Sequence, residues 1–272
     1  MLPRALNHMS VPGWRWDDFI GLARSIGCAG VEFRNDLSGS LFAGDDPARV
    51  RFVARDAGVR VLALAELKSF NDWSDRRRAE AAGLIDTAAA CGAEAVTLIP
   101  RSDGLGCGNG ERQANLRVAL RELAPMLAER KLVGLVEPLG FGICSLRRKS
   151  EAVDAIEALG LAERFRLVHD TFHHRLAGGE PMFAGHTGIV HVSGVIETEP
   201  ALHDLRDPHR ALVDARDRLG SAVQVRELRN AGYSGPVSIE AFAPCVHASH
   251  DPAGDLARSF EFIFSDPADR AA

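Results

Sequence analysis

The sequence predicts a single (β/α)8 TIM barrel, and three observations support that prediction. Eight short apolar runs alternate with longer amphipathic stretches along 272 residues, which fits a barrel of about 250 residues. Several runs are apolar at consecutive positions, as in parallel strands that are buried on both faces. No linker rich in proline or serine divides the chain, so we expect one domain over residues 1–272.

The eight runs are interpreted as strands because they are short, apolar and rich in residues that sheets favour. The run AEAVTLIP and the run LVGLVEP hold their apolar residues at consecutive positions. In chain order the expected strands are 4–9, 30–33, 59–66, 93–100, 132–138, 166–170, 189–194 and 236–242.

Amphipathic stretches between the runs predict the helices. Leu116, Leu120, Leu123 and Leu127 recur at helical spacing, and Gly92 is a plausible stop signal after an alanine-rich stretch. The expected helices are 16–26, 76–91, 111–130, 151–159, 222–231 and 253–264.

A doubly wound open sheet is the second possible fold. No GxGxxG motif opens a helix after the first run, so that fold's usual dinucleotide signature is missing. Two long irregular segments, 101–110 and 195–221, are expected to form loops at the catalytic face of the barrel.

Composition and charge argue against several classes of protein. A net charge of −5 does not favour a nucleic-acid partner. Five cysteines without a CxxC pair argue against a disulfide framework or a cysteine zinc site. Without a signal core, or the roughly 18 apolar residues of a membrane helix, we expect a cytoplasmic protein and no membrane partner. A homo-oligomer is compatible with the fold, but no interface signature is visible.

Metal-binding side chains stand at the ends of four successive strands, the fifth to the eighth: Glu137, Asp170, His191 and Glu240. The active site of a barrel gathers at these carboxyl ends. Each residue follows apolar neighbours, where a charge is costly unless it is paired or coordinated. Three carboxylates and one imidazole suit Mn²⁺, Mg²⁺, Co²⁺ or Zn²⁺. For any one of them alone, the alternative is a paired or solvated polar group.

Several histidines surround these strand ends. His173 lies three residues after Asp170, in the turn after the strand, where it can face the same mouth. His174 must then point elsewhere, and His169 points away from the barrel axis by strand alternation. His8, at the end of the first strand, could also reach the site. The alternative for His173 and His174 is that they are ordinary loop residues.

At these residues the sequence resembles the xylose-isomerase-like TIM-barrel superfamily, the sugar phosphate isomerase/epimerase family. The resemblance is carried by GLVEPLG, by the D-x-x-H spacing in RLVHDTFHH, by VHVSG and by AGYSGPVSIEAF. It is strongest to the 2-keto-myo-inositol isomerases (inosose isomerases), through VEFR with Glu32 and Arg34 and through VLALAELKSFNDWSDRR. The resemblance covers nearly the whole chain.

The resemblance implies one divalent metal ion held by Glu137, Asp170, His191 and Glu240. It also implies that Glu137 and Glu240 transfer protons from opposite faces of a bound substrate. His173 and an arginine after the seventh strand would hold substrate oxygens.

The sequence departs from the family pattern at that arginine. Many relatives place it six residues after the histidine ligand, where this chain has Glu197. The candidates are Arg206 and Arg210, and RDPHR favours Arg210. A glycine-rich segment that is common before the seventh helix is also replaced, by ALVDARDRLGSA.

These residue types suit the isomerisation of an α-hydroxyketone, which removes a proton beside a carbonyl and leaves an enediolate. A divalent metal stabilises that charge as a Lewis acid, and carboxylates on the fifth and eighth strands can flank one substrate and move the proton. The candidates for substrate binding are His173, Arg210, Lys68, Glu66 and Trp73. Core packing is the alternative for Trp73, and a solvated loop position is the alternative for Lys68.

The expected function is therefore metal-dependent isomerisation or epimerisation of a small-molecule sugar or cyclitol, a ketose or an inosose. An inosose dehydratase-type lyase would use the same metal and the same proton removal, and would differ in expelling a hydroxyl group. A non-catalytic sugar-binding barrel is a rival of another class. An abasic-site endonuclease is disfavoured, because strands two to four end without a histidine.

Overall fold

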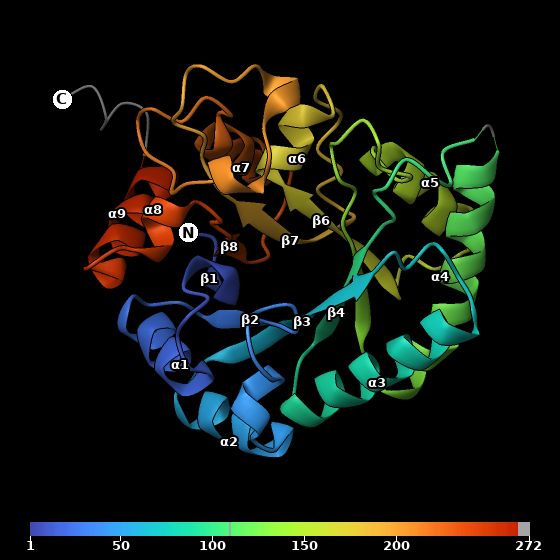
Figure 1. The fold of residues 1–272 in the computed structure, drawn as a ribbon, viewed down its shortest axis with the longest axis horizontal. Helices are drawn as coiled ribbons and strands as arrows, with labels where there is room; N and C mark the ends of the chain where they lie inside the picture. Colours follow the sequence, from blue (N-terminus) through green and yellow to red (C-terminus); the bar gives the residue numbers. More distant parts are fainter. Residues whose placement is uncertain (109, 266–272) are drawn as a thin grey trace.

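The computed structural model describes residues 1–108 and 110–265, and these residues form a closed barrel of eight parallel strands (Figure 1). The strands follow chain order around the barrel, and β8 pairs with β1 to close it. They are β1 (Arg4–Asn7), β2 (Gly30–Arg34), β3 (Arg60–Lys68), β4 (Ala95–Ile99), β5 (Val133–Val136), β6 (Phe165–Asp170), β7 (Thr187–Val192) and β8 (Val237–Ile239). The predicted (β/α)8 barrel is confirmed.

Helices surround the barrel on its outside (Figure 1). They are α1 (Trp16–Ser25), α2 (Pro47–Asp56), α3 (Asp75–Cys91), α4 (Glu111–Glu129), α5 (Lys149–Ala158), α6 (Thr171–Leu176), α7 (Ser221–Asn230), α8 (Pro244–His247) and α9 (Pro252–Phe264). Short 3-10 turns occupy His8–Ser10, Leu41–Gly44, Leu202–Asp204 and Asp207–His209. None of the helices in the described ranges is long and apolar enough to cross a membrane.

The six predicted helices are present, and their ends agree with the prediction within two residues. Three differences bear on the site. The first strand ends at Asn7, so His8 begins a 3-10 turn instead of ending the strand. Residues 171–176 form the helix α6 where a turn was expected, because the Asp170 side chain caps it by accepting the backbone N–H of His173. The last strand ends at Ile239 and not at 242.

The helix α2 was not predicted. Its sequence, PARVRFVARD, buries only Val50 and Ala54 and leaves Phe52 exposed, so its apolar face is too narrow to stand out. Asp46 caps the helix by accepting from the N–H of Ala48, and Pro47 stands at its first turn. Local capping therefore marks this helix better than its hydrophobic pattern does.

The two predicted loop segments differ in content. Segment 195–221 carries two 3-10 turns, and an isolated bridge joins its residue Ala211 to Gly194, two positions after the end of β7. In segment 101–110, residue 109 lies outside the described residues, and the other positions form no helix or strand before α4 begins at Glu111.

Candidate metal centre

Strand alternation directs the candidate ligands into the barrel mouth. Leu135, Val168 and Ile189 belong to a small apolar cluster contributed by β1 and by β3 to β7. The candidate ligands on β6 and β7, and the one just after β5, follow these three residues by two positions. Side chains two residues apart on a strand point to the same side. The same alternation that fills the interior with apolar side chains therefore places polar ones directly above them.

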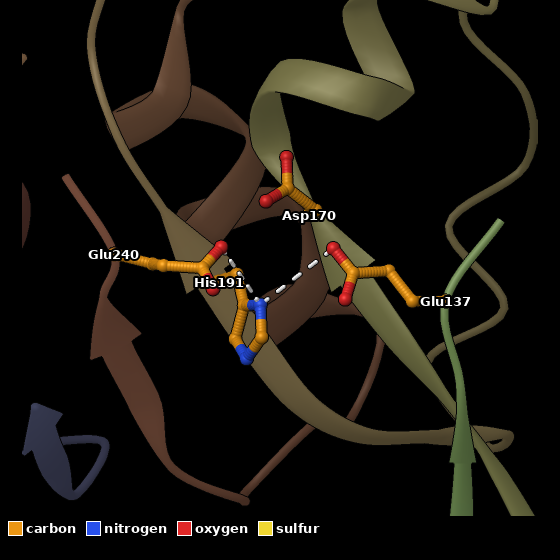
Figure 2. A group of neighbouring side chains, drawn as sticks. All are labelled: Glu137, Asp170, His191 and Glu240. Carbon is orange, nitrogen blue, oxygen red and sulfur yellow. Dashed lines mark ion pairs between the residues drawn. The ribbon is translucent and has the colours of Figure 1, made fainter. Parts of the chain in front are cut away.

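Glu137, Asp170, His191 and Glu240 form one buried group (Figure 2). One ligand atom from each lies within 4.8 Å of those from the other three. Figure 2 shows Glu137 and Glu240 on either side of the His191 ring, with Asp170 beside them. Each of these residues is at most 4% exposed. Three carboxylates this close together in a buried place need positive charge nearby.

One ring nitrogen of His191 fits a metal ligand. Its Nδ1 atom is buried and has no hydrogen-bond partner in the described part of the chain. That atom lies 3.3 Å from Glu240 Oε2 and 3.8 Å from Glu137 Oε1. The other nitrogen, Nε2, lies 2.9 Å from Glu32 Oε2. A group of three carboxylates and one unpartnered imidazole nitrogen matches the oxygen-rich ligand sets of divalent cations.

Arg210 contacts two members of this group. Its Nη2 atom donates to Asp170 Oδ2 and, at 2.8 Å, to Glu240 Oε2, and its Nε atom donates to Ser193 Oγ at 3.1 Å. Arg210 is buried, whereas Arg206 is exposed and donates to carbonyl oxygens of its own loop. The structure therefore brings Arg210, and not Arg206, to the predicted site.

His173 lies in the first turn of α6, next to the group. Its backbone N–H donates to Asp170 Oδ1 at 2.9 Å, which orients that carboxylate. The ring packs edge-on against Phe141 and Phe172, and its buried Nδ1 atom has no partner among the residues described. A Cβ atom at Gly140 would lie 2.3 Å from the carbonyl oxygen of His173. The loop after β5 can therefore pack on α6 only with glycine at this position.

A family model described as xylose isomerase-like TIM barrel matches residues 20–265 of this sequence. The chain belongs to the xylose isomerase-like TIM-barrel family. The family resemblance of the strand-end motifs is thereby confirmed over most of the chain.

Solved structures with this fold include a xylose isomerase domain containing protein from Salmonella typhimurium, 28% identical, with a TM-score of 0.90 over 97% of this chain and 98% of that one. The IOLI protein, solved with a bound zinc atom, is 17% identical, with a TM-score of 0.86 over 96% and 98%. An L-ribulose 3-epimerase is 16% identical, with a TM-score of 0.71 over 96% and 93%. The last two likenesses establish the fold. A comparison with curated proteins finds no match.

This member of the xylose isomerase-like family has a second arginine at the group, which the sequence analysis missed. Arg34, the last residue of β2, donates to Glu240 Oε1 at 2.7 Å and to Glu66 Oε2 at 3.0 Å. It also pairs with Asp36 at 2.7 Å. Lys68 is exposed and lies 3.3 Å from Glu66. Successive ion pairs therefore connect the exposed Lys68 to Glu66, Glu66 to Arg34, and Arg34 to Glu240 in the buried group.

Other predicted residues lie elsewhere in this family member. Trp73 is half-buried, packs against the outer hydrophobic core and lies under the Arg78 guanidinium, so the structure does not bring it to the group. His169 points away from the barrel axis as expected, with its Nδ1 atom 2.9 Å from Lys149 Nζ. The ring of His174 lies 4.8 Å from the His169 ring, also away from the mouth.

The electrostatic surroundings of the two glutamates differ. Burial raises the pKa of Glu137 to about 7, although His191 partly offsets that effect. Burial would also raise the pKa of Glu240, but the charges of His191 and Arg210 outweigh it and hold that pKa well below its ordinary value. Burial would lower the pKa of His191, yet nearby carboxylates hold it well above its ordinary value. The neighbouring positive charges therefore stabilise the ionised form of Glu240 more than that of Glu137.

A pocket of about 550 Å³ opens beside the ends of β1 and β2. Its wall includes His8, Trp14, Phe33, Arg34, Asn35 and Phe42. The His8 ring stacks on Phe19 at 4.2 Å, and its Nε2 atom donates to the carbonyl oxygen of Trp14 at 2.9 Å. Because Arg34 both lines this pocket and contacts Glu240, the pocket adjoins the buried group. Its volume lies within the range of small-molecule sites.

Proposed function

We propose that this protein is a divalent-metal-dependent isomerase or epimerase that acts on a ketose or an inosose through an enediolate. The observation that carries the proposal is the buried group itself, in which Glu137, Asp170, His191 and Glu240 present ligand atoms within 4.8 Å of one another. Their place at the carboxyl ends of barrel strands, where barrel enzymes hold their active sites, supports a catalytic role.

The four residues would hold the metal ion between them. When bound, a divalent cation supplies Lewis-acid stabilisation for the oxygens of an α-hydroxyketone. Glu137 and Glu240 lie on opposite sides of the His191 ring (Figure 2), so a substrate above that ring has a carboxylate on each side. One carboxylate would remove the proton beside the carbonyl, and the other would return a proton.

Neighbouring residues would hold the substrate and its charge. Arg210 and Arg34 each donate to a different oxygen of Glu240, which fixes the direction of that carboxylate. The buried Nδ1 atom of His173 is proposed to hydrogen-bond a substrate oxygen. Glu66 and Lys68 are proposed to contact the substrate at the rim of the site. Glu66 also pairs with Arg34, which links these two residues to the buried group.

The names of two structural neighbours support this chemistry. One is an L-ribulose 3-epimerase and the other is the IOLI protein with a bound zinc atom. The pocket beside β1 and β2 has aromatic walls and polar groups, a combination that suits the apolar C–H faces and the hydroxyl groups of a sugar or a cyclitol.

One experiment tests the proposal. Elemental analysis of the purified protein should find one divalent ion per chain, and the same sample should exchange deuterium from D₂O next to the carbonyl of 2-keto-myo-inositol or of a ketose, as followed by NMR. The product would distinguish an isomerase from an epimerase, and loss of water would identify a lyase. A protein that binds metal but exchanges no proton on any such substrate would contradict the proposed reaction.

A further inference from the structure

Glu32 is buried in β2 with no solvent exposure, and the reaction proposed above does not use it. Its Oε2 atom lies 2.9 Å from His191 Nε2. Its Oε1 atom accepts from Ser238 Oγ at 2.5 Å and from Asn7 Nδ2 at 3.5 Å. The carboxylate is therefore held by groups from β1 and β8 while it faces the imidazole of β7.

This contact fixes the direction of the His191 ring, because it gives Nε2–H an acceptor on the side away from Glu137 and Glu240. An ionised carboxylate can only accept a hydrogen bond, so Nε2 is the donor toward Glu32. The other ring nitrogen, Nδ1, faces Glu137 and Glu240, two of the proposed ligands. Without Glu32, the buried Nε2–H would lose its acceptor, and the ring would lose the contact that aims Nδ1 at the other carboxylates.

We propose that Glu32 is the positioning residue of the metal centre: by accepting the Nε2 proton of His191, it leaves Nδ1 free and correctly aimed to bind a divalent cation. This inference rests on the metal centre in the proposed function. Histidine ligands of metals commonly donate their second ring N–H to a carboxylate, and loss of such a partner typically costs about 10- to 100-fold in metal affinity.

The register of the barrel supports the assignment. Asn7 and Glu32 are paired positions on β1 and β2, and His191 and Ser238 are paired positions on β7 and β8. Four inward-facing polar residues thus lie on adjacent strands that pass through the point where the barrel closes. Glu32, which contacts the proposed ligand His191, is therefore held within a strand of the barrel and not in a loop.

The test measures the Zn²⁺ dissociation constant of the full-length protein by chelator competition. Glu32→Gln keeps the size of the side chain and removes its charge, and we expect it to bind Zn²⁺ about 10- to 100-fold more weakly. Glu180→Gln is the matched control. Glu180 accepts from Lys149 N and Ser150 Oγ and contacts none of the four proposed ligands, so this variant should bind Zn²⁺ as the unaltered protein does.

Two results would overturn the assignment of Glu32 alone: Glu32→Gln with unchanged Zn²⁺ affinity, or an equal loss in the control. If the unaltered protein binds no Zn²⁺, the metal centre fails and Glu32 fails with it. Should Glu32→Gln not fold, ¹⁵N NMR of the Zn²⁺-loaded unaltered protein decides the matter. His191 should then show a protonated Nε2 and a metal-shifted Nδ1, and the reverse pattern would contradict the proposal.

Discussion

Glu137→Gln should make the metal-free protein more stable at neutral and alkaline pH. Burial raises the pKa of Glu137 to about 7, against an ordinary value of 4.5. Between these two values the folded state binds more protons than the unfolded state, so the stability contributed by this group falls as the pH rises. Glu137 lowers the free energy of unfolding little below pH 4.5, and its full destabilising effect is present above pH 7. Glutamine carries no charge and avoids this cost.

The size of the effect follows from the shift. A difference between 4.5 and about 7 corresponds to about 3 kcal/mol, because one pKa unit is worth about 1.4 kcal/mol. Urea unfolding of both proteins in the presence of a chelator measures it across the pH range. The advantage of Glu137→Gln should be small near pH 4.5 and should approach about 3 kcal/mol by about pH 8. Groups that do not interact with Glu137 cancel in the difference between the two proteins, whereas His191, whose pKa Glu137 helps to raise, contributes to that difference.

The reasoning would be refuted if the two stability curves ran parallel over this range, or if the variant were the less stable protein at alkaline pH. A second readout links stability to function. The same variant should lose deuterium exchange into a ketose or an inosose, because it lacks one of the two proposed proton-transfer groups. Gain of stability together with loss of exchange would identify Glu137 as a residue retained for its chemistry.

The other predictions concern the remaining residues of the site. Glu240→Gln should keep the fold, measured by circular dichroism, and lower exchange by about 10²–10⁴-fold; undiminished turnover would remove its proposed role. Asp170→Ala or His191→Ala should lose the metal ion in elemental analysis, and full occupancy in either variant would contradict the assignment of ligands. His173→Ala should raise KM or lower kcat while the metal content stays unchanged, and a kinetically silent variant would remove it from the substrate contacts.

The ligand candidates were predictable because their signal is local. Glu137, Asp170 and His191 each stand two positions after an inward-facing apolar residue, and Glu240 follows Ser238 in the same way; the strand direction then places all four at the mouth of the barrel. Asp170 and His173 share a short motif, which also made their proximity predictable. Its structural reason, the helix cap, was not foreseen, since a cap and a turn have similar sequences at this length.

Glu32 and Arg34, which contact the proposed ligands from β2, could not be assigned to the site from sequence alone. Glu32 contacts His191 across 159 positions, and Arg34 contacts Glu240 across 206. The run GVEFR did show charged residues at alternate positions inside an apolar strand, which signals an inward-facing charge. Nothing in that run identifies its partners, because they depend on how the barrel closes. Trp73 shows the reverse case, since the sequence alone does not separate an aromatic residue at a site from one that packs on the core, as Trp73 does here.

The two halves of the barrel contribute unequally to the buried group. All four proposed ligands come from the segments that form or directly follow β5 to β8, whereas the side chains that orient two of them come from β2. A fragment limited to the second half would carry every ligand, together with Arg210, but would lack Glu32 and Arg34, which contact His191 and Glu240. Tight metal binding should therefore appear only after the first and second halves have joined during folding. The time at which metal binds during refolding should therefore report when the two halves of the barrel join.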